Sequence, residues 1–116
     1  MARLMSVTLT EQAVVERRKT VTRRLGWRML KPGDRLTLCR KVMGRKAGDP
    51  LVRLAEVEVV SVGFEPLWSI RDDETALEGL PHLTGHEFVE FFCHEMRVLP
   101  TTQVNRIEWR YLDGGQ

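Results

Sequence analysis

Several signatures of common functional classes are missing from this chain of 116 residues. No apolar run approaches the roughly 18 residues that a membrane helix needs, and the N-terminus lacks the apolar stretch of a secretory signal. There is no glycine-rich phosphate loop, no His-Glu-x-x-His and no Gly-x-Ser-x-Gly. We therefore expect a cytoplasmic protein with no membrane partner, outside the common nucleotide hydrolases, zinc proteases and serine hydrolases.

Cysteine is scarce, since the sequence contains only Cys39 and Cys93. Two distant thiols cannot build a disulfide framework, and we interpret both as small core residues. A zinc site could be assembled from Cys39, His82, His86, Cys93 and His94. Their spacing matches no familiar zinc motif, so we expect no metal and no cofactor.

The composition is that of an ordinary globular protein, with 42% hydrophobic and 29% charged residues, and its length fits a single domain over residues 1–116. The charge is unevenly distributed. Residues 1–53 contain 14 Lys/Arg and 4 Asp/Glu, whereas residues 54–116 contain 4 and 12. This asymmetry predicts either a positive groove for phosphates or ion pairing between the two halves.

Hydrophobic periodicity predicts a mixture of short strands and helices. We expect strands over residues 5–9, 20–24, 35–42, 51–62 and 104–112, a helix over 11–18 with Val14 and Val15 inward, and a helical turn within 72–79. Thr84 and Glu87 have the spacing of a capping box, and apolar residues follow at helical spacing through Met96. The 35–42 and 51–62 strands are expected to form an antiparallel hairpin. These elements favour an α+β fold, a small mixed β-barrel with flanking helices.

Residues 16–24 contain the highest concentration of charged and hydroxyl side chains, with five cations and two threonines. On an extended chain, Thr20, Thr22 and Arg24 would share one side. Such a face suits an anionic or polar ligand.

Lys19 stands among four arginines, and repulsion together with burial would lower its pKa. A neutral lysine can act as a base, and Thr22 would need one to become a nucleophile. Glu78, before a glycine, could orient the lysine. The alternative for Thr22 is a plain strand residue, and for Glu78 a plain helix-end acid.

Arg24 offers a donor fork to a phosphate or a pyrimidine carbonyl. Trp27 and Trp68 could each stack on a base, although a place in the core or at its rim is the alternative for both.

Four segments together resemble the ASCH domain of the PUA-like superfamily: 18–24, 30–36, Glu78-Gly79 and the 104–112 strand with Arg106-Ile107-Glu108-Trp109. The short chain is similar to the small stand-alone ASCH proteins of bacteria and bacteriophages. The resemblance implies a small β-barrel with flanking helices and a cleft associated with RNA.

One bacterial ASCH subfamily hydrolyses the amide of N4-acetylcytidine without a metal. By resemblance its lysine, threonine and arginine fall on Lys19, Thr22 and Arg24, and its glutamate on Glu78. Lys19 would then activate Thr22 for attack on the acetyl carbonyl.

Two other functions remain open for this chain. It could be a non-catalytic module that binds single-stranded RNA, with Arg17, Arg18 and Arg23 on phosphates and one base in the cleft. Ribonuclease activity, associated with some ASCH proteins, is the third hypothesis.

Overall fold

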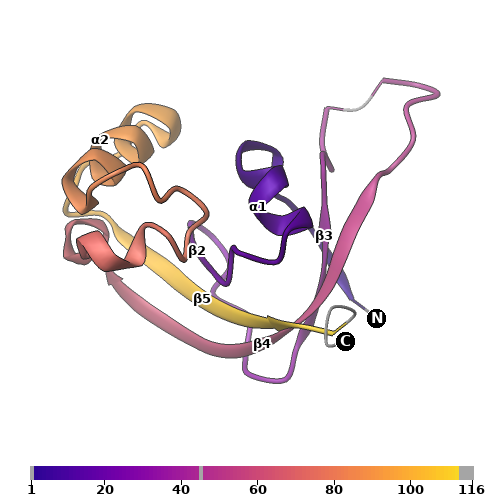
Figure 1. Ribbon diagram of the computed structural model, residues 1–116, viewed down its shortest axis with the longest axis horizontal. Helices are drawn as coiled ribbons and strands as arrows, with labels where there is room; N and C mark the ends of the chain where they lie inside the picture. The colour runs from indigo at the N-terminus through magenta and orange to yellow at the C-terminus, as the bar shows by residue number, and fades with distance from the viewer. Residues whose placement is uncertain (1, 45, 113–116) are drawn as a thin grey trace.

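A single curled sheet forms the centre of the computed structural model, which describes residues 2–44 and 46–112. Its five strands lie in the order β1-β3-β4-β5-β2. Figure 1 shows the sheet curling into an open half-barrel, with α2 at one end and α1 above its middle. The strands are β1 (Arg3–Ser6), β2 (Val21–Arg24), β3 (Arg35–Cys39), β4 (Arg53–Pro66) and β5 (Gln103–Tyr111). The helices are α1 (Glu11–Val15) and α2 (Gly85–Met96), with 3-10 helices η1 (Thr8–Thr10), η2 (Leu67–Ser69) and η3 (Asp72–Glu74).

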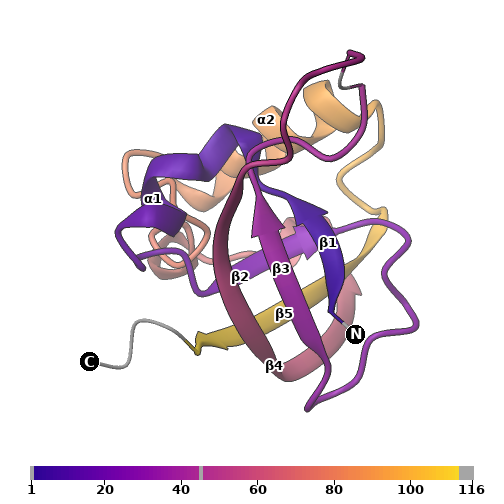
Figure 2. The same cartoon turned by 90° about the vertical axis from the view of Figure 1, so that its right-hand side faces the viewer.

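The long strand β4 gives the sheet its curvature. It pairs antiparallel with β3 along its first half and with β5 along most of its length, and its register shifts between Val59 and Ser61. A bulge of this kind bends a strand and increases its twist. Figure 2 shows β4 curving beneath β3 and β5. The predicted antiparallel hairpin is confirmed, but β4 continues to Pro66, beyond the predicted end at residue 62.

The remaining pairings place β1 and β2 at the two edges of the sheet. β1 runs parallel to β3, and β2 runs antiparallel to β5. The α+β class and the small mixed β-barrel with flanking helices, predicted from the sequence, are confirmed, with the barrel present as an open half-barrel.

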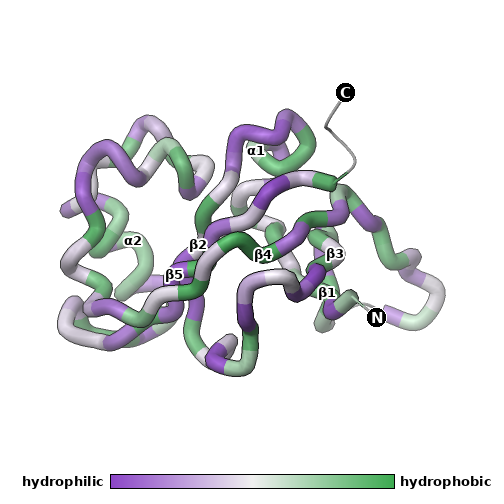
Figure 3. The backbone as a smooth tube through the Cα atoms, turned by 90° about the horizontal axis from the view of Figure 1, so that it is seen from below, coloured by the Kyte–Doolittle hydropathy of each residue, from purple (hydrophilic) through white to green (hydrophobic). Residues whose placement is uncertain are grey.

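Two apolar clusters fill the fold. One lies between α1 and the strongly curled part of the sheet and is built around Met5, Val14, Leu36, Val57 and Trp109. The other lies under α2 and contains Leu67, Ile70, Phe88, Val89, Phe92 and Val104. In Figure 3, seen from below, α1 and α2 stand apart, with β2 and β5 crossing between them. Polar side chains can therefore occupy the space between two separate cores.

Helix α1 is shorter than predicted, and its end redirects the chain. The sequence predicts a helix over 11–18, but α1 ends at Val15 because Arg17 has a left-handed φ of 63°. The prediction that Val15 faces inward is also wrong, since it is 47% exposed while Val14 is fully buried. The left-handed turn sends the next residues away from the helix axis and into β2.

Helix α2 agrees with its sequence signature. The Thr84 side chain accepts a hydrogen bond from the Glu87 backbone N–H, and the Glu87 carboxylate accepts one from the Thr84 N–H. This reciprocal pair is the predicted capping box. Phe88 and Phe92 are buried, whereas Met96 in the last turn is 48% exposed.

Other predicted boundaries shift by a few residues. The strand expected over 5–9 ends at Ser6, where η1 begins two residues later, and the strand expected over 35–42 ends at Cys39. The helical turn within 72–79 is the short η3 followed by turns. Within the described residues, no helix is long and apolar enough to cross a membrane.

Gly79 fixes how the 72–79 segment meets α1. Its φ is +89°, and a Cβ at this position would lie 2.9 Å from the Cβ of Ala13. Only glycine fits both the conformation and the space.

We expect Gly79→Ala to lower the free energy of unfolding by about 2–4 kcal/mol, combining left-handed strain with overpacking. Gly26 has a positive φ, but an added Cβ would meet open space there. Gly63 has no positive φ, and an added Cβ would also meet open space. Urea unfolding of the three variants checks this, with the loss expected to decrease in the order Gly79, Gly26, Gly63. Equal losses at Gly79 and Gly26 would show that contact with Ala13 is unimportant.

Candidate functional site

A cavity of about 390 Å³ opens between α2, η1 and β2. This volume lies in the range of roughly 300–1,000 Å³ that is usual for small-molecule pockets. Of the residues selected from the sequence, those that line it are Lys19, Thr22, Arg23, Arg24, Trp27 and Glu78. Those that do not line it are Arg17, Arg18, Thr20 and Trp68.

Lys19 is held at the cavity by both its backbone and its side chain. Its carbonyl oxygen accepts hydrogen bonds from Trp109 Nε1 at 2.9 Å and from the Tyr111 hydroxyl at 2.5 Å. Its Nζ donates to the Glu78 carbonyl oxygen at 2.6 Å and lies 3.4 Å from Glu78 Oε1. The residue is only 3% exposed. The amine is therefore fixed against a single partner residue.

The environment of Lys19 favours a neutral amine. Burial is the largest influence and lowers the pKa, because a charged ammonium loses its hydration there. The negative charge of Glu78 opposes this shift, whereas the positive charges of Arg24 and Arg23 add to it. The result is a lysine pKa below its ordinary value.

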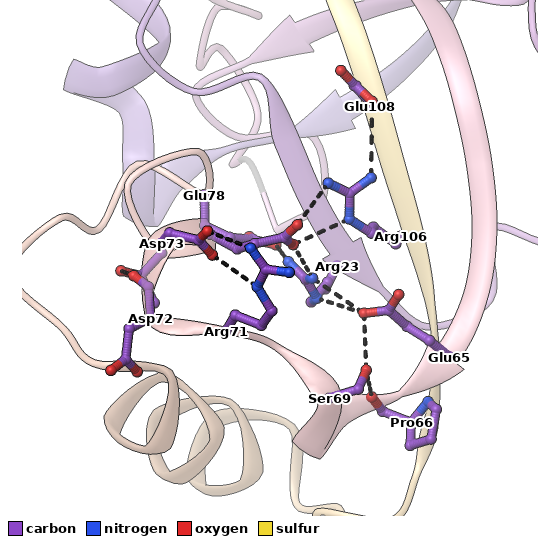
Figure 4. A network of polar contacts seen from close by, with 12 residues as sticks. Arg23, Glu65, Pro66, Ser69, Arg71, Asp72, Asp73, Glu78, Arg106 and Glu108 are labelled. Atoms are coloured by element: carbon purple, nitrogen blue, oxygen red, sulfur yellow. Dashed lines mark hydrogen bonds and ion pairs between the residues drawn. The ribbon is translucent and has the colours of Figure 1, made fainter.

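Arg23 is the centre of a buried ionic network. Its side chain is 1% exposed, and its NH1 donates to Glu78 Oε2 at 2.9 Å. Its NH2 donates to Glu65 Oε2 at 3.1 Å and also to Glu74. Arg106 forms a second link to Glu74, at 3.1 Å. The three carboxylates come from two segments, Glu65 from β4 and the other two from residues 72–79. Figure 4 shows Arg23 beside Glu65 and Glu78.

The network keeps its charges ionised. Burial opposes the charged form of Arg23, but hydrogen bonds and charge from Glu74 and Glu78 raise the pKa of Arg23 overall. Burial would likewise raise the pKa of Glu74, yet the guanidinium groups of Arg106 and Arg23 lower it. Arg23 lines the cavity while four hydrogen bonds join its guanidinium to three carboxylates.

Thr22 and Arg24 point the same way from β2, as strand alternation requires. Arg24 Nε donates to Thr22 Oγ1 at 3.1 Å, and Arg24 NH2 donates to the carbonyl oxygen of Ser6 at 2.6 Å. Ser6 ends β1, so this guanidinium links the two edge strands of the half-barrel. Burial lowers the pKa of Arg24, with Glu78 opposing the shift.

Two of the remaining candidates are occupied in structural contacts. Arg17 lies over the Tyr111 ring, 5.1 Å from its centroid, and donates to the Val14 carbonyl. Arg18 is exposed and pairs with Glu16 at 2.6 Å.

Thr20 and Trp68 also lie away from the cavity wall. The backbone N–H of Thr20 donates to the Leu77 carbonyl at 2.9 Å, so Thr20 joins the 72–79 segment to β2. Trp68 belongs to η2 and is 59% exposed. Of the two candidate tryptophans, only Trp27 lines the cavity, and its backbone N–H donates to Asn105 Oδ1 at 3.2 Å.

Sequence reasoning missed the apolar wall of the cavity. Helix α2 contributes Phe88, Phe91, Phe92, Glu95 and Met96 to the lining. The apolar residues at helical spacing indicate a core face, and Phe88 and Phe92 belong to the core cluster under α2 and also line the cavity. The available signal was the position of Phe91 at the edge of the apolar face of this helix, because a residue there faces whatever adjoins the core. In the structure Phe91 is half-buried.

The cysteines and histidines form no metal site within the described residues, where no group of three or more metal-ligating side chains occurs. Cys39 is fully buried, as interpreted from the sequence, and Cys93 is half-buried beside the α2 core.

Comparisons with known proteins identify the fold. Neither protein-family models nor curated proteins match the sequence. Among solved structures, protein EF3133 from Enterococcus faecalis V583, of family DUF984, matches with a TM-score of 0.67 and 17% identity, over 97% of this chain and 80% of that one. The hypothetical protein PH0355 matches with a TM-score of 0.64 and 20% identity, over 97% and 100% of the two chains. An ASCH domain from Lactobacillus crispatus JV V101 matches with a TM-score of 0.59 and 15% identity, over 89% and 70%.

The chain therefore has the fold of the ASCH domain, as its sequence resemblance implies. At these identities the likeness concerns the path of the backbone. The chemistry has to be argued from the side chains in the cavity.

We expect Arg23→Met to lower the free energy of unfolding by about 3–5 kcal/mol, because it leaves buried carboxylates without their partner. The matched control is Arg71→Met, which removes an exposed pair with Asp73 and should change stability little. Urea unfolding measures both. Equal effects would mean that the buried network contributes no more than a surface pair.

The lowered pKa of Lys19 predicts a specific pH dependence. Between that pKa and the ordinary lysine value of about 10.4, the unfolded chain binds more protons than the folded one, so stability rises with pH. Relative to Lys19→Met, the free energy of unfolding of the wild type should rise by up to about 1.4 kcal/mol per pH unit in this window. Urea unfolding from neutral to alkaline pH checks this, with Lys41→Met as an exposed control. Parallel profiles for wild type and Lys19→Met would contradict it.

Proposed function

We propose that this protein is a metal-independent amidohydrolase that acts on N4-acetylcytidine or a related modified nucleoside. The observation that carries the proposal is a buried lysine with a lowered pKa that shares one cavity with a threonine hydroxyl and a carboxylate. Perturbed titratable groups in a concave pocket are the usual mark of a reactive centre.

The hydrogen bonds of Lys19 suit a general base. A neutral amine has two N–H donors and one lone pair, and the two donors can serve the carbonyl oxygen and Oε1 of Glu78. The lone pair then remains available to accept the proton of Thr22. Among the described residues no hydrogen bond joins Lys19 Nζ to Thr22, so the contact is expected to form with substrate bound.

The reaction follows as two proton-balanced steps. Thr22 Oγ1 attacks the acetyl carbonyl carbon while its proton passes to Lys19 Nζ. The bond from that carbon to N4 then breaks, and the Lys19 proton passes to N4. Cytidine leaves, and the acetyl group stays behind as an ester on Thr22. Water then gives one proton to Lys19 and attacks the ester carbon, the bond to Thr22 Oγ1 breaks, and Lys19 returns the proton to Thr22. Acetic acid leaves and ionises to acetate and a proton in solution.

The other polar groups position the substrate. Glu78 fixes Lys19, and Arg23 fixes Glu78 through its second carboxylate oxygen. Arg24, already aimed at Thr22, can donate to a pyrimidine carbonyl at the same end of the cavity. Trp27 offers a flat surface for the base.

The charge of the cavity favours a nucleoside over an RNA backbone. Its lining contains Lys19, Arg23 and Arg24, but Arg23 is bound by three carboxylates, and Glu78 and Glu95 contribute negative charge. The other wall is aromatic and aliphatic. Such a pocket provides little attraction for a row of phosphates, which a non-catalytic RNA module would require.

The decisive experiment is chromatographic detection of cytidine released from N4-acetylcytidine by the purified protein. We expect turnover, and a loss of about 10²–10⁴-fold in kcat for Lys19→Ala and for Thr22→Ala. The value of kcat/KM should rise with pH through the lowered pKa of Lys19, because only the neutral amine is a base.

One matched control lies on the same segment and a second lies outside it. Thr20→Ala removes a threonine that does not line the cavity, and Lys41→Ala removes an exposed lysine, so both should retain activity. No turnover by a folded wild-type protein would refute the amidohydrolase proposal for this substrate. Equal losses in Thr20→Ala and Thr22→Ala would refute the role of Thr22.

A further inference from the structure

A second recess, of about 250 Å³, carries an excess of positive charge. Its lining is Arg3, Met29, Leu30, Lys31, Asp34 and Arg35, none of which lines the first cavity. We propose that it binds a phosphate group, either free or as part of a single-stranded RNA. This inference does not depend on the amidohydrolase proposal.

Within the described residues, the three cations of the recess lack the carboxylate partners that several other surface cations have. Arg18, Arg40 and Arg110 are exposed, and each is paired with a carboxylate. In the part of the chain that the structure describes, Arg3, Lys31 and Arg35 have no ion pair or side-chain hydrogen bond.

The convergence of these cations is a product of the fold. Arg3 begins β1 and Arg35 begins β3, and the parallel register of the two strands sets Arg3 beside Leu36. Lys31 comes from the turn that precedes β3. Residues from two separate parts of the sequence thus meet at one end of the sheet, and only the parallel pairing brings them together.

The turn that carries Lys31 is anchored on both sides. Gly33 N–H donates to the Val59 carbonyl at 2.9 Å, and Val59 N–H donates to the Asp34 carbonyl at 2.8 Å. The carboxylate of Asp34, the single acid of the lining, accepts the Lys31 backbone N–H at 3.0 Å. Its acceptor capacity is partly used within the turn, so it neutralises little of the surrounding charge. A ligand would meet a site that is already shaped.

Phosphate is the ligand class that suits this arrangement. Two guanidinium forks and an ammonium around a recess can donate several charge-assisted hydrogen bonds to phosphate oxygens. A neutral or cationic ligand would leave these charges without compensation.

The test compares two triple variants that remove the same charge. Arg3→Gln/Lys31→Gln/Arg35→Gln empties the recess of cations, and Arg18→Gln/Arg40→Gln/Arg110→Gln removes three paired surface cations. Binding of a short oligouridylate is measured by fluorescence anisotropy over a range of salt. Binding of inorganic phosphate is measured by NMR shifts of residues 29–35.

We expect the recess variant to weaken oligouridylate binding, and to reduce the slope of log K against log salt by about 2, at roughly 0.7 for each counterion released. The surface control should keep most of the wild-type slope. Binding of inorganic phosphate alone, abolished in the recess variant, would support the site and identify free phosphate as its source.

Equal weakening in both triple variants would overturn the proposal, because general charge would then explain binding. Binding of neither probe by the wild type would overturn it as well. If the recess variant fails to fold, Lys31→Gln alone should still reduce the slope by about 0.7. Amide hydrolysis is expected to be unchanged in the recess variant, which separates this site from the first cavity.

Discussion

The carboxylate of Glu78 is the constraint on which the site depends. Its Oε2 accepts from Arg23 at 2.9 Å and its Oε1 lies 3.4 Å from Lys19 Nζ, and all three residues are almost fully buried. Burying these charges costs several kcal/mol per ion, so each must be compensated by its neighbours. Because Glu78 stands in the 72–79 segment and the two cations stand on or next to β2, this compensation also joins that segment to the edge of the sheet.

The two cations respond to burial in opposite ways. The Arg23 guanidinium is delocalised and surrounded by three carboxylates, so it remains charged. Burial lowers the pKa of Lys19, and two neighbouring arginines add to this shift, while Glu78 is the single carboxylate that opposes it. One group therefore supplies a fixed charge while the other can change its protonation state. A network with only arginines would lack the titratable amine, and one with only lysines would lack the fixed charge.

Local sequence patterns predicted the elements well and the polar site only in part. The Thr84 capping box and the β3–β4 hairpin follow from short-range rules, and both were found. The pairing of Lys19 with Glu78 spans 59 residues. It was suggested by the two residue types and by the ASCH resemblance, because periodicity carries no information over such a separation. The partners of Arg23 were not foreseen because they lie 42 to 55 residues away along the chain. The left-handed Arg17 that ends α1 was not foreseen because no glycine marks this helix end in the sequence.

The open form of the half-barrel explains why the reactive segment lies where it does. An edge strand leaves backbone groups unpaired, and proteins usually cover or occupy such edges. Here Arg24 on the β2 edge donates to the carbonyl oxygen of Ser6 on the β1 edge, and its Nε also holds Thr22. The same guanidinium thus spans the gap in the sheet and orients the hydroxyl beside the cavity. A closed barrel would satisfy the edges with backbone hydrogen bonds and leave no gap for a ligand, so the incomplete closure is itself a condition for the site.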